Sequence, residues 1–193
     1  QRQMCIRDRW QYGNVNKTVM STTKKTLLMI LYYSGILALS RLIPHPPNFT
    51  PIIAMAVFMP YMIRDVYVAM LIPLMAMFIS DLYLGMHSSM FWVYGSIMLC
   101  TLLSASTLKQ KSLKHLASVS VGSSVMFYVI TNFAVWSTST MYPKTLEGLV
   151  MCYTMAIPFF QNTFVSTILY VSVLFLIYET AKRSYSWLKR QYL

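Results

Sequence analysis

Acidic residues are scarce in this chain. Only five of its 193 residues are Asp or Glu, and all charged residues together make up 11% of it. In soluble globular proteins roughly a quarter of the residues are charged, and these residues lie mostly on the surface that faces water. Because 56% of the residues are hydrophobic as well, the composition excludes an ordinary soluble domain and predicts a chain whose solvent is lipid.

Cysteine and catalytic motifs are also scarce. The three cysteines, Cys5, Cys100 and Cys152, have no paired spacing, so we expect them to be unpaired and without a catalytic role. No GxSxG, HExxH or P-loop pattern occurs, and neither does a pair of closely spaced carboxylates. These absences predict a protein that is not an enzyme, has no cofactor and does not energise transport with ATP by itself.

Basic residues give the chain a net charge of +11, and they lie in short clusters between long apolar runs. This arrangement leaves no polar domain to carry a binding face, so we expect no nucleic-acid partner. Membrane topology explains the clusters better, because Lys and Arg are retained on the cytoplasmic side of a membrane.

Six apolar runs are candidate transmembrane helices, judged against the roughly 20 residues that cross about 30 Å of hydrocarbon. They cover residues 26–43, 51–63, 66–84, 90–107, 116–136 and 160–178. The second run is short. A further apolar piece near 147–158 is placed as a re-entrant or surface-lying helix on the outer face, with Pro158 at its end. The predicted fold is an all-α integral membrane protein with six transmembrane helices.

Loop charge sets the predicted orientation, with both termini on the cytoplasmic side. Only Arg41 and Lys144 then lie on outer segments. Residues 1–19 are expected to be a non-native or disordered leader, since 1–10 resemble translated adaptor sequence. Residues 20–181 form the single membrane domain, and 182–193 form a basic cytoplasmic tail. The expected location is the bacterial cytoplasmic (inner) membrane, so the lipid bilayer is the first partner.

The first outer loop, 41–51 (RLIPHPPNFTP), contains four prolines, which hold a chain extended and stiff. Such a loop is either a lid or a plain connector. It carries His45 and Asn48, and His87 lies in the next outer loop. With Asp81, the two histidines have side chains suited to a metal, but their spacing matches no metal site and we expect none.

Arg41 and Asp81 lie near the outer ends of the first and third predicted spans. A pair between them reduces the cost of burying both charges. Alternatively, a free Arg41 can hold an anionic group of a ligand. Both interpretations stay open at this level.

Asn132 and Trp136 lie one helical turn apart on the fifth predicted span. Together they suit a flat heteroaromatic ligand, or else they are an interhelical hydrogen bond and an interfacial tryptophan. A further polar cluster includes Tyr153 and, at the start of the last span, Gln161 and Asn162. These two amides face solvent or a cavity, or they serve helix entry.

Ser34, Gly35 and Ala38 form a small-residue patch on the first predicted span. Small residues let helices approach closely, so the patch fits either a contact with another membrane subunit or packing inside the bundle.

Four segments carry a resemblance: 41–51 (RLIPHPPNFTP), 80–87 (SDLYLGMH), 131–136 (TNFAVW) and 142–162, which begins with YPKT and ends with PFFQN. They look like an uncharacterised bacterial membrane family, which is itself similar to the substrate-binding S components of energy-coupling factor (ECF) vitamin transporters. The resemblance implies a six-helix protein that captures a micronutrient on the outer side under its first loop.

The same resemblance implies a transmembrane coupling subunit and two ATPases as partners. Small residues on the first helix of S components contact the coupling subunit, and Ser34, Gly35 and Ala38 are the nearest match in this chain. The alanine pair usual in S components is absent.

The sequence therefore predicts a substrate-capturing membrane subunit for a small organic, vitamin-like micronutrient. Its predicted site residues are Arg41, His45, Asn48, Asp81, His87, Asn132, Trp136, Tyr153 and Asn162. The alternative is a structural or assembly membrane protein without a ligand, in which the polar outer residues are spread around the bundle. An intramembrane enzyme with a histidine base lacks any nucleophile with a partner.

Overall fold

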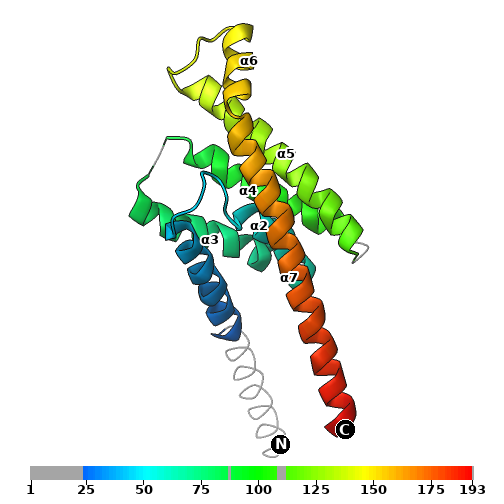
Figure 1. Cartoon of the computed structure of the whole chain (residues 1–193). Helices are drawn as coiled ribbons and strands as arrows, with labels where there is room; N and C mark the ends of the chain where they lie inside the picture. Colours follow the sequence, from blue (N-terminus) through cyan, green and yellow to red (C-terminus); the bar gives the residue numbers. More distant parts are fainter. Residues whose placement is uncertain (1–23, 87, 108–111, 193) are drawn as a thin grey trace, which may run out of the picture.

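The computed structural model describes residues 24–86, 88–107 and 112–192, with side chains up to residue 184. All regular structure in these ranges is helical (Figure 1). The N-terminal helix, Lys24–Leu42, is followed by α2 (Ile52–Met62), α3 (Val66–Leu84), α4 (Met90–Thr107), α5 (Leu113–Thr138), α6 (Leu146–Met155) and α7 (Ile157–Tyr192). The predicted leader 1–19 and the predicted site residue His87 lie outside the described residues.

Five of the described helices are long and apolar enough to cross a membrane: the N-terminal helix, α3, α4, α5 and α7. Many large apolar side chains on them point away from the bundle, including Leu28, Leu39, Phe91 and Leu176. Outward-facing apolar surface of this extent is typical of contact with lipid. The described chain is therefore a helical membrane protein with several crossings.

The bounds of α3 and α4 coincide with the predicted spans 66–84 and 90–107, and α5 exceeds its prediction by two or three residues at each end. The last helix differs more. It continues to Tyr192, through most of the segment predicted as a tail, and its 36 residues correspond to about 54 Å, well beyond the hydrocarbon thickness.

The short helix α2 forms the centre of the molecule and contacts α3, α4, α5 and α7. Nine of its eleven residues are buried, as expected for a helix that is apolar on all sides. Eleven residues span only about 16 Å, which is too short to cross a membrane. The run 51–63, predicted as a full span, is therefore a buried core helix of less than membrane length.

Buried serines join the helices through carbonyl groups. Ser104 Oγ donates to Val57 O at 2.6 Å, which attaches α4 to α2, and Ser34 Oγ donates to Ile72 O at 3.0 Å, which attaches the N-terminal helix to α3. Ser34 and Ala38 are both buried within the chain, and Gly35 is half-buried. Ser34 and Ala38 therefore pack inside the bundle, which is one of the two interpretations that the sequence left open.

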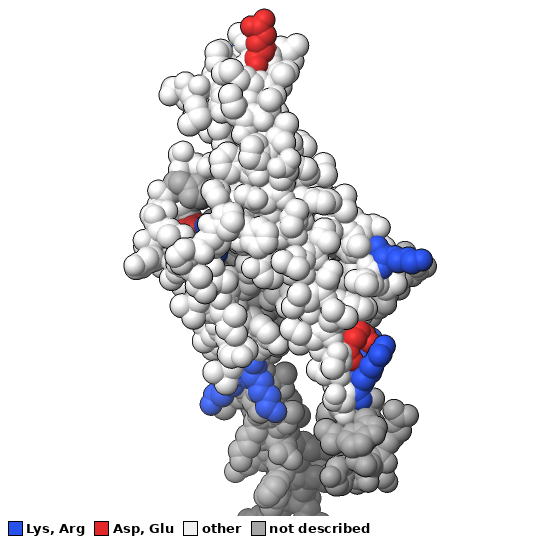
Figure 2. All heavy atoms as spheres, in the orientation of Figure 1, with Lys and Arg blue, Asp and Glu red and all other residues white. Residues whose placement is uncertain are grey.

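Both ends of the described chain lie at one end of the molecule, and α6 lies at the opposite end (Figure 1). The end with α6 is called here the outer end, after the orientation predicted from the sequence. In Figure 2, many of the basic atoms lie toward the end with the termini, and further charged atoms show at the left and right sides of the broad middle, whose remaining surface is uncharged. This distribution agrees with a membrane-embedded middle.

A short helix, α6, covers most of the segment near 147–158 that was predicted as a re-entrant or surface-lying helix, but it ends before Pro158. α6 leads into α7 in nearly the same direction (Figure 1), because Ala156 between them keeps helical angles (φ −85°, ψ −8°). Pro158 lies in the first turn of α7 instead of at the end of α6, and its missing N–H explains the break. The two helices thus form an interrupted rod that projects at the outer end.

Candidate ligand-binding site at the outer end

The first loop folds over the outer end of the bundle and is attached to α7. Phe49 N donates to Pro46 O at 3.0 Å and closes a turn, within which Asn48 adopts a left-handed backbone conformation (φ 62°) that asparagine tolerates. Asn162 Nδ2 donates to Pro47 O at 2.9 Å, and the rings of Phe49 and Tyr170 contact edge to face at 6.0 Å. The loop is therefore a fixed cover and not a free connector.

A cavity of about 310 Å³ lies beneath this loop. Its polar wall comes from the end of the N-terminal helix, the loop and α7: Arg41, His45, Asn48, Thr50 and Thr163. Its apolar wall comes from α2, α3, α4 and α5: Ile52, Ile53, Met77, Leu84, Val93, Ile97 and Phe127. A concave, mainly apolar space with a few convergent polar groups is the usual form of a small-molecule site.

A second cavity of about 210 Å³ adjoins the first. The two share four lining residues, Asn48, Val93, Phe127 and Thr163. The second extends toward α5 and the start of α7. Its other lining residues are mostly polar or aromatic: Ser89, Tyr128, Thr131, Asn132, Val135, Phe159 and Phe160. Asn48 thus lines both of these neighbouring cavities, which are called here the two-part site.

The shortness of α2 explains why there is room for this site. Ile52 and Ile53, the first residues of α2, line the larger cavity. A helix of about 20 residues would extend about two and a half turns further. The loop and the cavity occupy the outer side of the bundle instead.

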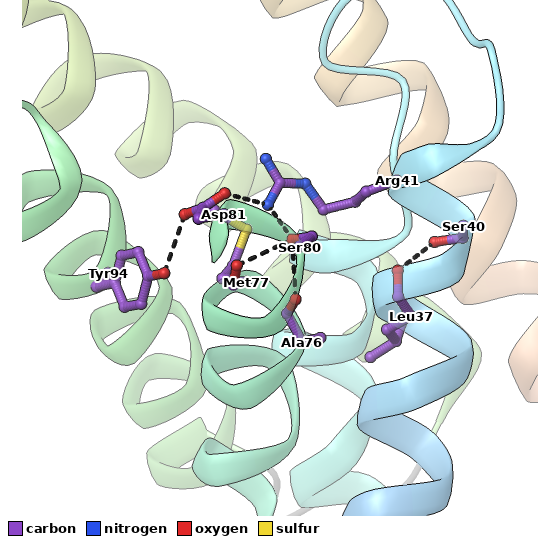
Figure 3. A network of polar contacts seen from close by, with 8 residues as sticks. All are labelled: Leu37, Ser40, Arg41, Ala76, Met77, Ser80, Asp81 and Tyr94. Atoms are coloured by element: carbon purple, nitrogen blue, oxygen red, sulfur yellow. Dashed lines mark hydrogen bonds and ion pairs between the residues drawn. The ribbon is translucent and has the colours of Figure 1, made fainter. Parts of the chain in front are cut away.

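Arg41 is held by α3 in a network of polar contacts (Figure 3). Its Nη1 lies 2.7 Å from Asp81 Oδ1 and also donates to Ser80 Oγ. The other carboxylate oxygen of Asp81 accepts a hydrogen bond from Tyr94 of α4 at 2.9 Å. The predicted pairing of Arg41 with Asp81 is therefore present, and it joins three helices.

Burial differs between the two partners of this ion pair. The Asp81 side chain is 2% exposed, whereas that of Arg41 is 18% exposed and lines the larger cavity. The second terminal nitrogen of Arg41 points away from Asp81 and Ser80 in Figure 3. Arg41 consequently pairs with Asp81 and also lines the cavity, so the two predicted roles are compatible.

Trp136 does not line either cavity, contrary to the predicted stacking surface. Its Nε1 donates to Pro143 O at 2.9 Å, and Lys144 Nζ donates to the carbonyls of Trp136 and Ser139 and lies 5.7 Å from the Trp136 ring centre. These contacts close the turn between α5 and α6. Only Asn132 of the predicted pair reaches the site, where its Nδ2 donates to Tyr128 O at 2.8 Å on its own helix.

Tyr153 also lies outside both cavities. Its hydroxyl donates to Val129 O at 2.7 Å, and the Tyr128 hydroxyl donates to Tyr153 O at 2.6 Å, so α5 and α6 exchange two hydrogen bonds. Cys152, between these contacts, is buried, and burial raises the pKa of its thiol. Tyr153 was predicted to bind substrate, but its hydrogen-bonding groups are used to attach α6 to α5.

The remaining predicted residues either line the larger cavity or hold the loop that covers it. His45 and Asn48 line the larger cavity, while Asn162 supports the covering loop from outside it. The sequence-based prediction missed Tyr94, Thr50, Phe127 and Thr163. Tyr94 could have been predicted from the sequence. Asp81 lies about one turn before the end of α3 and Tyr94 about one turn after the start of α4, so both side chains lie at about the same depth in the bundle. Within the described residues, no cluster of His, Cys, Asp or Glu could hold a metal ion.

Comparison with known sequences places the chain in a family. A family of unknown function, DUF6580, matches residues 20–190. The chain belongs to this family. No curated protein and no solved structure matches it. The comparisons thus give a membership and no activity, and the likeness to ECF S components stays a prediction.

Proposed function

We propose that this protein is a membrane subunit that captures a small organic micronutrient at its outer end and delivers it for uptake. The observation that carries the proposal is the two-part cavity, on which polar side chains from the first loop, the N-terminal helix, α5 and α7 converge. A ligand-free structural protein has no need for such convergence.

The covering loop supports the same function. A site that collects a scarce nutrient needs a wall that is ordered before binding, because ordering a loop on binding costs affinity. The loop is held by Asn162 and by the contact of Phe49 with Tyr170, so much of that ordering is already present. Binding is also a better fit than catalysis, because the described residues of the cavity walls include a single histidine, His45, and neither a cysteine nor a carboxylate.

The proposal includes a transmembrane coupling subunit and ATPases as partners, and the bacterial cytoplasmic membrane as location. Support for them is the sequence resemblance to S components together with the lack of any P-loop in the chain. Because Ser34 and Ala38 pack internally, a coupling subunit would have to use the outward, apolar face of the N-terminal helix or another helix.

A structural or assembly role is the second candidate. It is favoured by the contacts of Trp136, Tyr153 and Asn162, whose side chains donate to backbone carbonyls and join segments of the fold. Under this alternative the cavities would be packing defects filled by lipid or water.

Native mass spectrometry of the gently purified full chain distinguishes these two functions. We expect a stoichiometric small molecule that is lost in Asn48→Gly and Asn132→Ala. Glycine accepts the positive φ of Asn48, so the first variant removes only a cavity wall.

Trp136→Phe is the matched control, because Trp136 lies outside both cavities. It should retain the molecule. A protein that carries no small molecule and is not stabilised against heat by a panel of vitamins, where binding would raise the melting temperature, would favour the structural role.

A further inference from the structure

The charges around the two cavities point to the chemical class of the ligand. Among the described residues that line them, Arg41 is the only one with a permanent charge, and His45 is the only other basic side chain. No Asp or Glu is part of either described wall. A ligand cation would therefore be desolvated without a partner, which is costly.

Arg41 is positioned to bind an acid group. Asp81 and Ser80 fix one edge of the guanidinium through Nη1, and the remaining terminal nitrogen points away from them (Figure 3). The other carboxylate oxygen of Asp81 accepts a hydrogen bond from the Tyr94 hydroxyl, so Arg41 is not the only group that stabilises this carboxylate. A planar guanidinium held in this way offers directed N–H donors that match a carboxylate.

The number of charges limits the anion. One arginine, whose charge is partly balanced by Asp81, does not compensate a doubly charged phosphate. A single carboxylate, reinforced by donors on the loop such as His45 or Asn48, fits this end of the site. The opposite end is aromatic, since Phe127, Tyr128 and Phe160 line the smaller cavity, and such a wall suits a ring.

We infer that the ligand is a monocarboxylate with a ring system, whose acid group binds Arg41 in the larger cavity and whose ring occupies the smaller, aromatic cavity. This inference rests on the proposed capture function. It adds an orientation to it: the acid group lies beneath the first loop and the ring lies between α5 and α7.

Two matched series of probes test the inference on the full chain in detergent: cinnamate, cinnamamide and cinnamylamine, and the corresponding naphthoate, naphthamide and naphthylmethylamine. Within each series the ring is constant and the head group is anionic, neutral or cationic. Calorimetry should give at least about tenfold tighter binding for the acid than for the amide, as a charge-assisted hydrogen bond implies, and no binding of the amine.

Arg41→Lys tests the assigned residue. Lysine keeps a positive charge opposite Asp81 but loses the guanidinium edge, so the preference for acid over amide should fall to about threefold or less. Lys144→Gln is the control, because Lys144 is a basic residue of the outer end that lines neither cavity. It should keep the preference of the unmodified protein.

Equal binding of acid and amide, tighter binding of an amine, or a preference that is unchanged in Arg41→Lys would each overturn the inference. So would a failure of both series to bind, or a co-purified molecule that has no acid group. A co-purified molecule without an acid group would contradict only the inference and leave the capture function intact. A protein that binds no small molecule of any charge would contradict both the inference and the capture function.

Discussion

The outer end contains two polar clusters that look alike in the sequence and differ in the structure. The loop cluster comprises Arg41, His45, Asn48 and Thr50, and these side chains line a cavity. The hairpin cluster comprises Trp136, Lys144 and Tyr153, and these side chains bond to carbonyls of the α5–α6 turn or of α5. Polar groups that reach backbone carbonyls are used for folding, whereas those facing a space left by a short helix stay available for a ligand.

The largest expected effect comes from breaking the ion pair below the loop cluster. Arg41→Met leaves Asp81 buried without its cation, and we expect a loss on the order of 3 kcal/mol in the free energy of unfolding. Unfolding in detergent, followed by circular dichroism, measures the loss. The double variant Arg41→Met/Asp81→Asn should recover at least half of it, because no uncompensated charge remains. Full stability of the single variant would show that the pair does not join these helices.

The next largest effect concerns the hairpin cluster. In Gly148→Ala the added Cβ would lie 2.1 Å from Pro143 O, so the turn must shift, at a cost of about 1–3 kcal/mol. Labelling of the buried Cys152 with a maleimide, in a background in which Cys5 is replaced with Ser, should become faster as α6 loosens.

Gly35→Ala is the matched control for this substitution, since nothing lies within 4 Å of a Cβ at that position. Equal labelling rates in the two glycine variants would contradict the close approach of Gly148 to Pro143.

A smaller effect separates the two clusters by function. Trp136→Phe removes the hydrogen bond to Pro143 O and should cost about 1 kcal/mol of stability. Binding of the co-purified molecule or of cinnamate should be unchanged, because the residue lines neither cavity. A large loss of binding with intact stability would restore Trp136 to the ligand site.

The smallest effect on stability is expected for the attachment of the loop. Asn162→Ala removes the exposed hydrogen bond to Pro47 O and should cost less than about 1 kcal/mol. Amide hydrogen exchange at Phe49, whose N–H closes the turn with Pro46, should nevertheless become faster. Gln161→Ala, one position earlier on α7, serves as control and should leave this exchange unchanged.

Much of the helical framework was accessible from hydropathy, because lipid demands long apolar runs whatever their partners. α3 and α4 were predicted to the residue. The pairing of Arg41 with Asp81 was also accessible, since both charges lie at one depth and neither is stable alone in hydrocarbon. The end of α6 and the extension of α7 were misjudged, because Pro158 only weakens the connection between α6 and α7 and a polar surface does not end a helix.

The candidate site was predicted only in part. The loop residues were identified by their polar character, but the same criterion also selected Trp136 and Tyr153. Their hydrogen-bond acceptors are carbonyls of Pro143 and Val129, and backbone carbonyls carry no signature in a sequence. The apolar members of the wall, such as Phe127, are indistinguishable from ordinary core or lipid-facing residues until the neighbouring helices are in place.

The sequence by itself determined that this protein is a helical membrane protein with its charge concentrated at the ends of its helices, because composition and hydropathy decide which solvent the chain tolerates. Only the tertiary structure decided that α2 is a short buried helix, that a cavity adjoins its first residues, and which polar groups line it. The physical reason is that solvent preference is a property of segments, whereas a cavity is a property of how segments of unequal length pack together.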